Sequence, residues 1–277
     1  MDGEKGSVVM PNPHNPFYVP EAYSKWDKIS AAARFEQVAH KLTPDEQTSV
    51  LASIVAFAGT SPDKVSFGDV LRWWVLAGQT GDSLMDNTQR WKLKCGQTGF
   101  ALKIFEDAQS SGKLSYSFST PVEKVEHSGQ AVKVTAKGGQ SFAARFVVTT
   151  VPLNTLKDIV FDPPLAKGKQ LAASEGQVNL CVKTHIEVEG TEYRTWSAAS
   201  FPGPLAGVFG DGITPSGNTH IVSFAANGSF TGSDKGFPEI KAAYQSLKPF
   251  NIKRMVSRTR DCFLNFGSVL ELTGFVD

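Results

Sequence analysis

Apolar residues in the first third of the chain recur at the three- and four-residue spacing of amphipathic helices. Segment 43–59, TPDEQTSVLASIVAFAG, carries a full set of helix signals. Thr43 is a suitable N-cap, Pro44 suits the first helical position, Glu46 closes a capping box, and Gly59 is a typical stop. The pattern therefore predicts a helix that begins after Thr43 and ends at Gly59.

Similar signals predict helices on both sides of this segment. Ser30 and Ser66 are expected to cap two of them, and a further helix covers about residues 98–112. Helices should therefore dominate to about residue 111. Four prolines argue for extended or loop structure before them: Pro11, Pro13, Pro16 and Pro20.

After Gly112 the apolar positions change to a period of two, which indicates strands. TPVEKVEH and AVKVTAK are expected to pair through the turn Ser128–Gly129–Gln130. A third strand follows, and its apolar later part, Phe146–Val151, is typical of a strand buried on both faces.

The remaining chain reads as a helix, four strands, a helix and a strand, in that order. The helices are LAKGKQLAASEG and GFPEIKAAYQSLK, and the strands are QVNLCVKTHIEV, RTWSAAS, LAGVFGD, THIVSFAA and NIKRMVSRTR. Within them, GVFGDG opens no helix, so we interpret it as a hairpin or loop. The fold class is α+β. The apolar end, CFLNFGSVLELTGFVD, is either a buried terminal strand or the point where the chain stops before its fold is complete.

Composition narrows the function. The chain has 28 Lys and Arg against 27 Asp and Glu, so it carries no basic field for nucleic acid. Since no apolar run approaches the roughly 20 residues of a membrane span, no transmembrane segment is expected. The chain has three cysteines, Cys95, Cys181 and Cys262, an odd number at wide spacing, so no disulfide framework is expected. The five histidines do not have the spacing of metal ligands, so no metal site is expected either. These features favour a cytoplasmic protein.

The order of several segments resembles a fungal flavin-containing monoamine oxidase. They are FGDVLRWWVLAG, RWKLKCGQTGFA, STPVEKVEH, FVVTTVPLNTLKDIVFDPPL, GQVNLCVKTHIEVEG and FGDGITPSGNTHIVSF. The resemblance implies a substrate domain with a mixed sheet and flanking helices, joined to an FAD-binding domain. The Gly-rich Rossmann turn and the C-terminal flavin-binding segment of that family are not in the sequence, so we expect a truncated relative that binds FAD weakly or not at all.

The resemblance also implies cofactor-contacting residues. Gly96 and Gln97 match the turn that lies close to the flavin, and glycine there permits close approach of the backbone. Val122 matches a valine that contacts the adenine side through its backbone. Thr150 and Pro152 lie in the loop at the end of the predicted buried strand.

Substrate chemistry is expected on the strand of GQVNLCVKTH. The family places a lysine, bridged by water to the flavin, four residues after a glycine, and that position is Leu180 when counted from Gly176. Lys183 becomes the catalytic candidate, although a solvated strand lysine is the alternative and residues 180 and 183 point to opposite faces of a regular strand. Phe201 is a candidate for the wall of the substrate pocket.

Three functions remain open. The first is oxidation of a small amine to an imine with bound FAD. The second is a cofactor-free relative that reuses the substrate cavity for cyclisation or isomerisation in a biosynthetic pathway, such as fungal secondary metabolism. The third is a non-catalytic binding module or a fragment, whose exposed apolar surface would promote a homo-oligomer.

The expected organisation has four parts. Residues 1–29 are an extended segment, 30–94 the helical part of the substrate domain, 95–152 the remnant of the FAD domain, and 153–277 the sheet part of the substrate domain.

Overall fold

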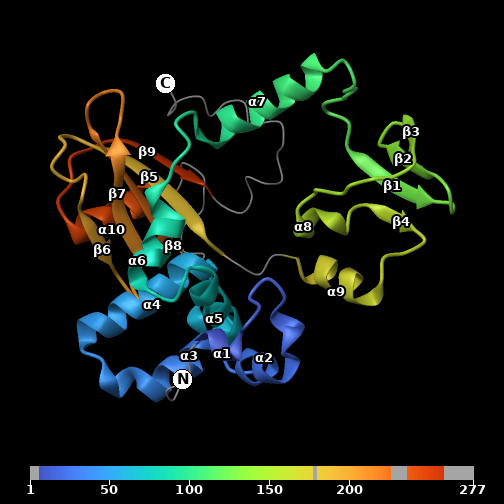
Figure 1. The fold of residues 1–277 in the computed structure, drawn as a ribbon. Coiled ribbons are helices and arrows are strands. Elements are labelled where there is room, and N and C mark those ends of the chain that lie inside the picture. Colours follow the sequence, from blue (N-terminus) through green and yellow to red (C-terminus); the bar gives the residue numbers. More distant parts are fainter. Residues whose placement is uncertain (1–5, 177–179, 226–235, 259–277) are drawn as a thin grey trace. The chain divides into compact units, whose positions relative to one another are not determined.

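The computed structural model describes residues 6–176, 180–225 and 236–258, which form two compact units (Figure 1). The first unit contains the described residues up to Gly96 and those from 180 onward, and the second contains 97–176. The sequence grouped 153–176 with the sheet of the substrate domain. These residues instead belong to the second unit, because β4 (Val160–Asp162) pairs there with β1 (Val122–His127).

Helix α4 (Pro44–Ala58) of the first unit is confirmed in its details. The Thr43 side chain accepts the N–H of Glu46 at 3.4 Å, and Glu46 Oε2 accepts the N–H of Thr43 at 2.8 Å. Gly59 ends the helix with a φ of 65°, a left-handed conformation that favours glycine. The local sequence therefore sets both ends of α4.

The neighbouring helices also begin where the sequence predicts. Helix α3 (Ala31–Val38) follows Ser30, whose hydroxyl accepts the N–H of Ala33 at 3.1 Å. Helix α5 (Phe67–Leu76) follows Ser66, whose hydroxyl accepts the N–H of Gly68 at 3.0 Å. A short helix, α6 (Gly81–Met85), and a π-helical segment, Asp86–Arg90, complete this group.

The start of the chain is more helical than expected. Its elements are α1 (Gly6–Val9), a 3₁₀ segment (Pro16–Tyr18) and α2 (Pro20–Asp27). Pro16 and Pro20 favoured an extended chain in the sequence analysis, but each occupies the first position of a helical turn. A backbone N–H at that position forms no hydrogen bond within the helix, so proline is tolerated there. The prediction of an extended 1–29 segment is therefore wrong.

The first unit contains a five-stranded antiparallel sheet with the order β6-β7-β8-β5-β9. Its strands are β5 (Val182–Val188), β6 (Ser197–Ala199), β7 (Gly207–Ile213), β8 (Thr219–Ala225) and β9 (Ile252–Arg258). All five were predicted, and GVFGDG forms most of β7, one arm of the β7–β8 hairpin.

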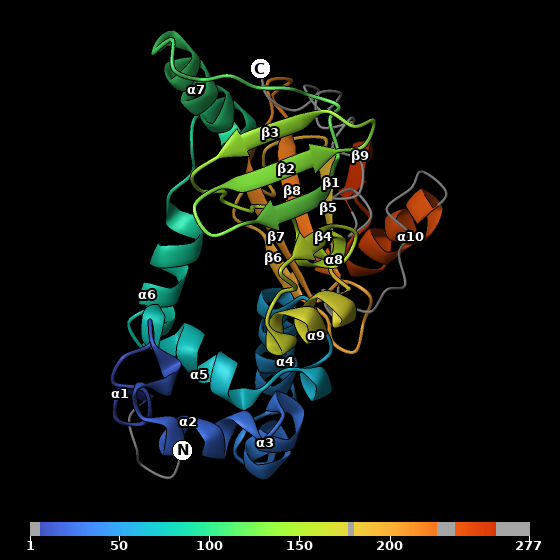
Figure 2. The same cartoon turned by 90° about the vertical axis from the view of Figure 1, so that its right-hand side faces the viewer.

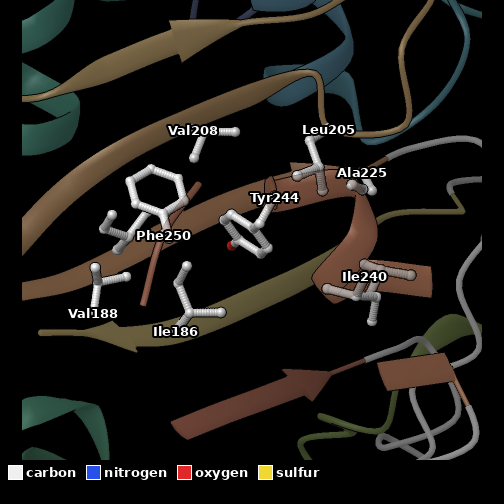
Figure 3. Packing of buried hydrophobic residues seen from close by; sticks show 11 residues of the cluster. Ile186, Val188, Leu205, Val208, Ala225, Ile240, Tyr244 and Phe250 are labelled. Atoms are coloured by element: carbon white, nitrogen blue, oxygen red, sulfur yellow. The ribbon is translucent and has the colours of Figure 1, made fainter. Parts of the chain in front are cut away.

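One face of this sheet packs against α10 (Phe237–Leu247). Figure 3 shows the resulting core, in which Ile186, Ile240 and Tyr244 are fully buried. Helix α4 also packs on the sheet, through Val55 against Ala206. At least one helix of the N-terminal group therefore packs on the later strands.

A group of three buried hydroxyls joins α10 to the sheet. Tyr244 Oη lies 2.7 Å from Thr184 Oγ1 on β5 and 2.8 Å from Ser223 Oγ on β8, and the Thr184 and Ser223 hydroxyls also contact each other. All three residues are fully buried. Because each hydroxyl has partners, this polar group can lie in an apolar core at little cost.

The second unit is built on a four-stranded sheet with the order β3-β2-β1-β4. Strand β1 pairs antiparallel with β2 (Val132–Ala136), which pairs with β3 (Ser141–Ala144), and Figure 2 shows these three strands side by side. Its helices are α7 (Gly96–Ser110), α8 (Leu153–Leu156) and α9 (Lys167–Glu175). The predicted hairpin turn is confirmed, with Gly129 at a φ of 76°.

The apolar run at 146–151 is not the expected buried strand. It forms no strand, and Phe146 and Val148 are 83% and 86% exposed. A strand is buried on both faces only where neighbours pair with it and cover it, and within residues 6–176 no strand pairs with this run. Separately, none of the helices that the structure describes is long and apolar enough to span a bilayer.

The hydroxyl group predicts a specific effect on stability. Tyr244→Phe should lower the free energy of unfolding by about 1 kcal/mol, because Thr184 and Ser223 keep each other as partners. Burial raises the pKa of Tyr244 from 10.0 to about 12. The unfolded chain therefore ionises first, and the contribution of Tyr244 is complete below pH 10 and is lost as the pH rises towards 12.

Urea unfolding of wild type and variant across this pH range checks both effects. Tyr18→Phe is the matched control, since Tyr18 is 65% exposed. A Tyr244→Phe protein that loses stability between pH 10 and 12 as steeply as the wild type would contradict the prediction.

Candidate functional site

Strand β5 divides its side chains between the two faces of the five-stranded sheet. Val182, Ile186 and Val188 lie in the core under α10. Because side chains alternate along a strand, the intervening residues lie on the opposite face. They are Lys183, His185 and Glu187.

Strands β7 and β8 add polar and aromatic groups to the same face. On β8, Ile221 and Ala225 belong to the core, so His220 and Phe224 point the other way. Phe209 and Asp211 of β7 join them, since Phe209 contacts Phe224 and Asp211 contacts His220. We call this set the polar face: Lys183, His185, Glu187, Phe209, Asp211, His220 and Phe224.

A chain of four side chains runs across the polar face. Lys92, which follows the π-helical segment, forms an ion pair with Asp211 and also donates to its carbonyl oxygen at 2.7 Å. Asp211 Oδ2 lies 3.4 Å from His220 Nδ1. His220 Nε2 in turn lies 2.9 Å from His185 Nδ1.

Asp211 is strongly acidic in this arrangement. Burial alone would raise the pKa of its carboxyl, but hydrogen bonds from His220 and Lys92, together with the positive charge of Lys92, outweigh that cost and lower the pKa to about 2. The carboxylate is therefore ionised at neutral pH and can only accept hydrogen bonds.

Lys183 lies beside the aromatic part of the polar face. It is exposed, and its Nζ lies 5.3 Å from the centre of the Phe224 ring. The Phe224 and Phe209 rings are 6.2 Å apart and tilted by 32°. Phe224 therefore presents its ring face to a cation, which is the geometry of a cation–π contact.

Leu180 occupies the position that the family resemblance assigns to a lysine. Its N–H donates to the carbonyl of Gly59 at 2.8 Å, which ties the chain before β5 to the end of α4. Burial raises the pKa of the next residue, Cys181, while the charge of Lys183 opposes that shift. Neither residue offers a charged group to the polar face.

A separate apolar cavity of about 540 Å³ lies among helices α3 to α6. Five rings line it, from Phe35, Phe57, Phe67, Trp73 and Trp74, and its polar lining consists of Arg34, Ser49 and Ser53. Arg34 is bound in place: Nη1 donates to Gln37 Oε1 at 2.7 Å, and its guanidinium lies over Trp26 and Phe67.

Helix α4 separates this cavity from the sheet. Ser49, Ser53 and Phe57 face the cavity, whereas Val55 packs on Ala206 of the sheet side. The expected pocket residue Phe201 packs on Val55 and Ala206, so it lies on the sheet side of α4 and does not line the cavity.

The cofactor candidates of the second unit offer backbone groups. Val122 pairs with Ala136 of β2, but the ladder between β1 and β4 covers only Lys124 to Glu126. The backbone groups of Val122 that point towards the β4 side therefore lie beyond that ladder and can bind a ligand. This geometry fits the adenine contact that the resemblance implies.

Gly96 and Gln97 open helix α7, which has 15 residues. Gly96 has a φ of 66°, a conformation that side-chain-bearing residues rarely adopt. The first N–H groups of a helix have no partner within it and favour anionic groups such as phosphate. The arrangement fits a turn that approaches a cofactor closely.

Thr150 is exposed, and Pro152 is the residue before α8. Asn154, the second residue of α8, was not predicted from the sequence. Its Oδ1 is buried and has no hydrogen-bond partner among the described residues. A buried acceptor of this kind fits a ligand donor such as a ribose hydroxyl or a ring N–H.

The predicted site residues therefore fall into two groups. Gly96, Lys183 and Phe201 belong to the first unit, and the second unit contains Gln97, Val122, Thr150 and Pro152. Sequence reasoning missed the contact of His185, His220 and Asp211. The alternation along β5 places His185 on the same face as Lys183. No local sequence signal predicts that β7 and β8 lie beside β5.

The comparisons with known proteins agree on one family. A family model described as flavin containing amine oxidoreductase matches residues 24–232. The chain is 26% identical over 222 residues to pseudooxynicotine dehydrogenase of a Pseudomonas species, covering 79% of this chain and 43% of that protein. It is 30% identical over 197 residues to nicotine dehydrogenase of Pseudomonas putida, covering 71% and 39%.

Solved structures show the same fold. A double mutant of putrescine oxidase has a TM-score of 0.70 at 17% identity, covering 91% of this chain and 58% of that one. Cyclohexylamine oxidase from Brevibacterium oxydans has a TM-score of 0.68 at 14% identity, covering 92% and 59%. The chain spans less than half the length of the two curated relatives and less than two thirds of these structures.

The acidity of Asp211 predicts how stability depends on pH. Its pKa is lowered from 3.8 to about 2, so the unfolded chain binds the proton first. The contribution of Asp211 is therefore complete above about pH 4 and is lost as the pH falls towards 2. Asp211→Asn should lower the free energy of unfolding at pH 7 by about 1–2 kcal/mol, because bonds to a charged acceptor are lost.

Denaturant unfolding between pH 2 and pH 7 measures this difference. The variant should show a smaller fall of stability with acid than the wild type. Asp107→Asn, an exposed change on α7, is the control and should leave the pH profile unchanged. Equal acid sensitivity of Asp211→Asn and wild type would contradict the assigned role.

Proposed function

The chain belongs to the flavin-containing amine oxidoreductase family, and from that membership we propose that it contributes the amine-binding part of an enzyme that oxidises an amine to an imine. The observation that supports this proposal is the position of the Lys183 ammonium over the Phe224 ring, 5.3 Å from its centre. A ring face that attracts one ammonium group can attract a substrate ammonium once the exposed Lys183 side chain has moved aside.

The substrate is proposed to be a small amine with a cyclic, apolar body. Phe209 and Phe224 together present two tilted rings beside the cation position. Flat apolar rings bind a cyclic body better than a thin aliphatic diamine. The names of the related proteins contain both kinds of amine: nicotine and pseudooxynicotine have a ring, whereas putrescine is an aliphatic diamine.

FAD is proposed as the cofactor, and when bound it would supply the two-electron acceptor for the oxidation. Gly96 and Gln97 would approach it through the backbone at the start of α7, and Val122 through backbone groups that lie beyond the ladder between β1 and β4. Thr150, Pro152 and the buried acceptor of Asn154 would complete the contacts of the second unit.

Lys183 is proposed as the charged group that orients polar atoms at the reaction site. It is exposed and carries three donors, so it can hold a water molecule. It lies beside Phe224, the ring proposed to bind the amine.

A cofactor-free function stays the second candidate, because Leu180 stands where the family resemblance requires a lysine. In that case the polar face would bind and isomerise a small molecule without electron transfer. The two candidates differ in one measurable property, which is whether an amine reduces added FAD in the presence of the protein.

The first test uses the full chain with excess FAD and nicotine in the absence of oxygen. We expect the visible absorbance of the flavin to bleach as it is reduced, faster with nicotine than with putrescine. Free FAD with each amine is the control. Binding of nicotine without any bleaching would reject the oxidase function and favour the cofactor-free candidate.

The second test concerns the ring of Phe224. Phe224→Leu keeps an apolar side chain but removes the ring face, so binding of protonated nicotine should weaken by about 5- to 30-fold, as expected for a cation–π contact of about 1–2 kcal/mol. Calorimetric titration measures this. Phe142→Leu on β3, an exposed position of the second unit, is the matched control. Unchanged affinity in Phe224→Leu would place the amine elsewhere.

A further inference from the structure

The apolar cavity among helices α3 to α6 has no part in the proposed amine contact or in the proposed cofactor contacts. It lies within the first unit, and its volume of about 540 Å³ falls in the range of about 300–1,000 Å³ that small-molecule pockets occupy. Rings and aliphatic side chains make up most of its wall. A cavity with such a lining holds water poorly and binds apolar molecules.

Small side chains on α4 help to keep this space open. Ser49 and Ser53 are one helical turn apart, and both line the cavity. Rings from the neighbouring helices also line it, among them Phe35 of α3 and Trp73 and Trp74 of α5. The Ser53 hydroxyl donates to the carbonyl of Ser49 at 2.8 Å, so it has its hydrogen bond within the helix and does not require one from a ligand.

Several large apolar side chains of the cavity keep exposed surface. Val50 and Phe57 of α4 are 38% and 39% exposed, and Trp74 of α5 is 36% exposed. A molecule that fills the cavity removes part of this surface from water, and the gain is proportional to the apolar area that is buried. A molecule with flat rings also gains offset-stacked or edge-to-face contacts with Phe57 and Trp74.

The charges of the lining favour an uncharged ligand. Among the lining residues that the structure describes, none is acidic, so an ammonium ion would meet no carboxylate there. The charged residue of the lining, Arg34, is positive and buried. Its guanidinium lies over the rings of Trp26 and Phe67. A protonated amine would therefore lose its hydration in the cavity without gaining an ionic partner.

We propose that this cavity is a second small-molecule site, which binds an uncharged molecule with more than one aromatic ring. The site is distinct from the polar face, where the amine is proposed to bind. Helix α4 stands between the two, with Ser53 and Phe57 on the cavity side and Val55 packed on Ala206 of the sheet side. A substitution on the cavity side of α4 therefore changes one site and leaves the side chains of the other in place.

The test is a calorimetric titration of the full chain with flavone, an uncharged molecule that has aromatic rings and no amine. The wild type should bind flavone saturably, and nicotine hydrochloride should not displace it. Ser53→Phe places a ring in the cavity and should weaken flavone binding at least about tenfold, because the ring and the ligand would occupy the same space. Displacement of flavone by nicotine would show one shared site and overturn the proposal.

Ser174→Phe on α9 is the matched control. Ser174, like Ser53, is an exposed helical serine, and its hydroxyl also donates to a nearby carbonyl of its own helix, that of Leu171 at 2.7 Å. This variant should bind flavone as the wild type does. A folded Ser53→Phe protein with the affinity of the wild type would overturn the proposal, and so would a wild type without saturable flavone binding.

A second variant keeps the test decisive if Ser53→Phe does not fold. Phe57→Leu keeps an apolar side chain but removes one ring from the wall, so flavone should bind roughly 2- to 12-fold more weakly. Phe142→Leu is its control, because Phe142 is 42% exposed and lies in the second unit. Unchanged affinity in Phe57→Leu, or a loss of flavone binding in Phe224→Leu, would place the molecule outside the cavity and overturn the proposal. These titrations involve neither FAD nor an amine reaction, so their failure would leave the proposed function standing.

Discussion

The register of strand β5 is the constraint on which the first unit depends. Its core side chains, among them Ile186 and Val188, are fully buried under α10. The hydroxyl of Thr184 forms a hydrogen bond with the hydroxyl of Tyr244. A slip of one residue would turn all of these outward and bury Lys183 in their place, at the cost of an uncompensated buried charge. Because α10 covers one face of the sheet, the polar residues of β5 lie on the other face. The polar face is thus a consequence of the core.

Most of the first unit's architecture could be predicted because its signals are local. Thr43, Glu46 and Gly59 fix the ends of α4 through contacts within a few residues, and the alternation along β5 and β8 follows from their own sequence. The run at 146–151 shows the limit of such signals. Its side chains are apolar enough for a buried strand, but burial depends on partners that a hydrophobic pattern does not contain. The same holds for residues 153–176, which join the second unit through the pairing of β4 with β1.

The candidate site was predictable only in part, for a related reason. Lys183 was the catalytic candidate, with a solvated strand lysine as the alternative, and the structure places it at an exposed position of β5. The contact of His185 with His220 joins residues 35 apart in sequence, and Asp211 reaches His220 from a third strand. Five histidines without ligand spacing indicate no site on their own. Only the order β7-β8-β5 brings two of them and a carboxylate together.

Leu180 shows how this arrangement constrains the chemistry. The N–H of Leu180 is committed to the carbonyl of Gly59, so the start of β5 is tied to the end of α4 and its position along the chain is set. A leucine can neither hold a proton nor bind a water molecule at that point. The next β5 side chains on the polar face are Lys183 and His185, and of these two only His185 is linked through His220 to an ionised carboxylate. Asp211 belongs to β7 and is linked to His185 of β5 through His220 of β8. The composition of the polar face therefore depends on the pairing of β7 with β8 as directly as on the sequence of β5.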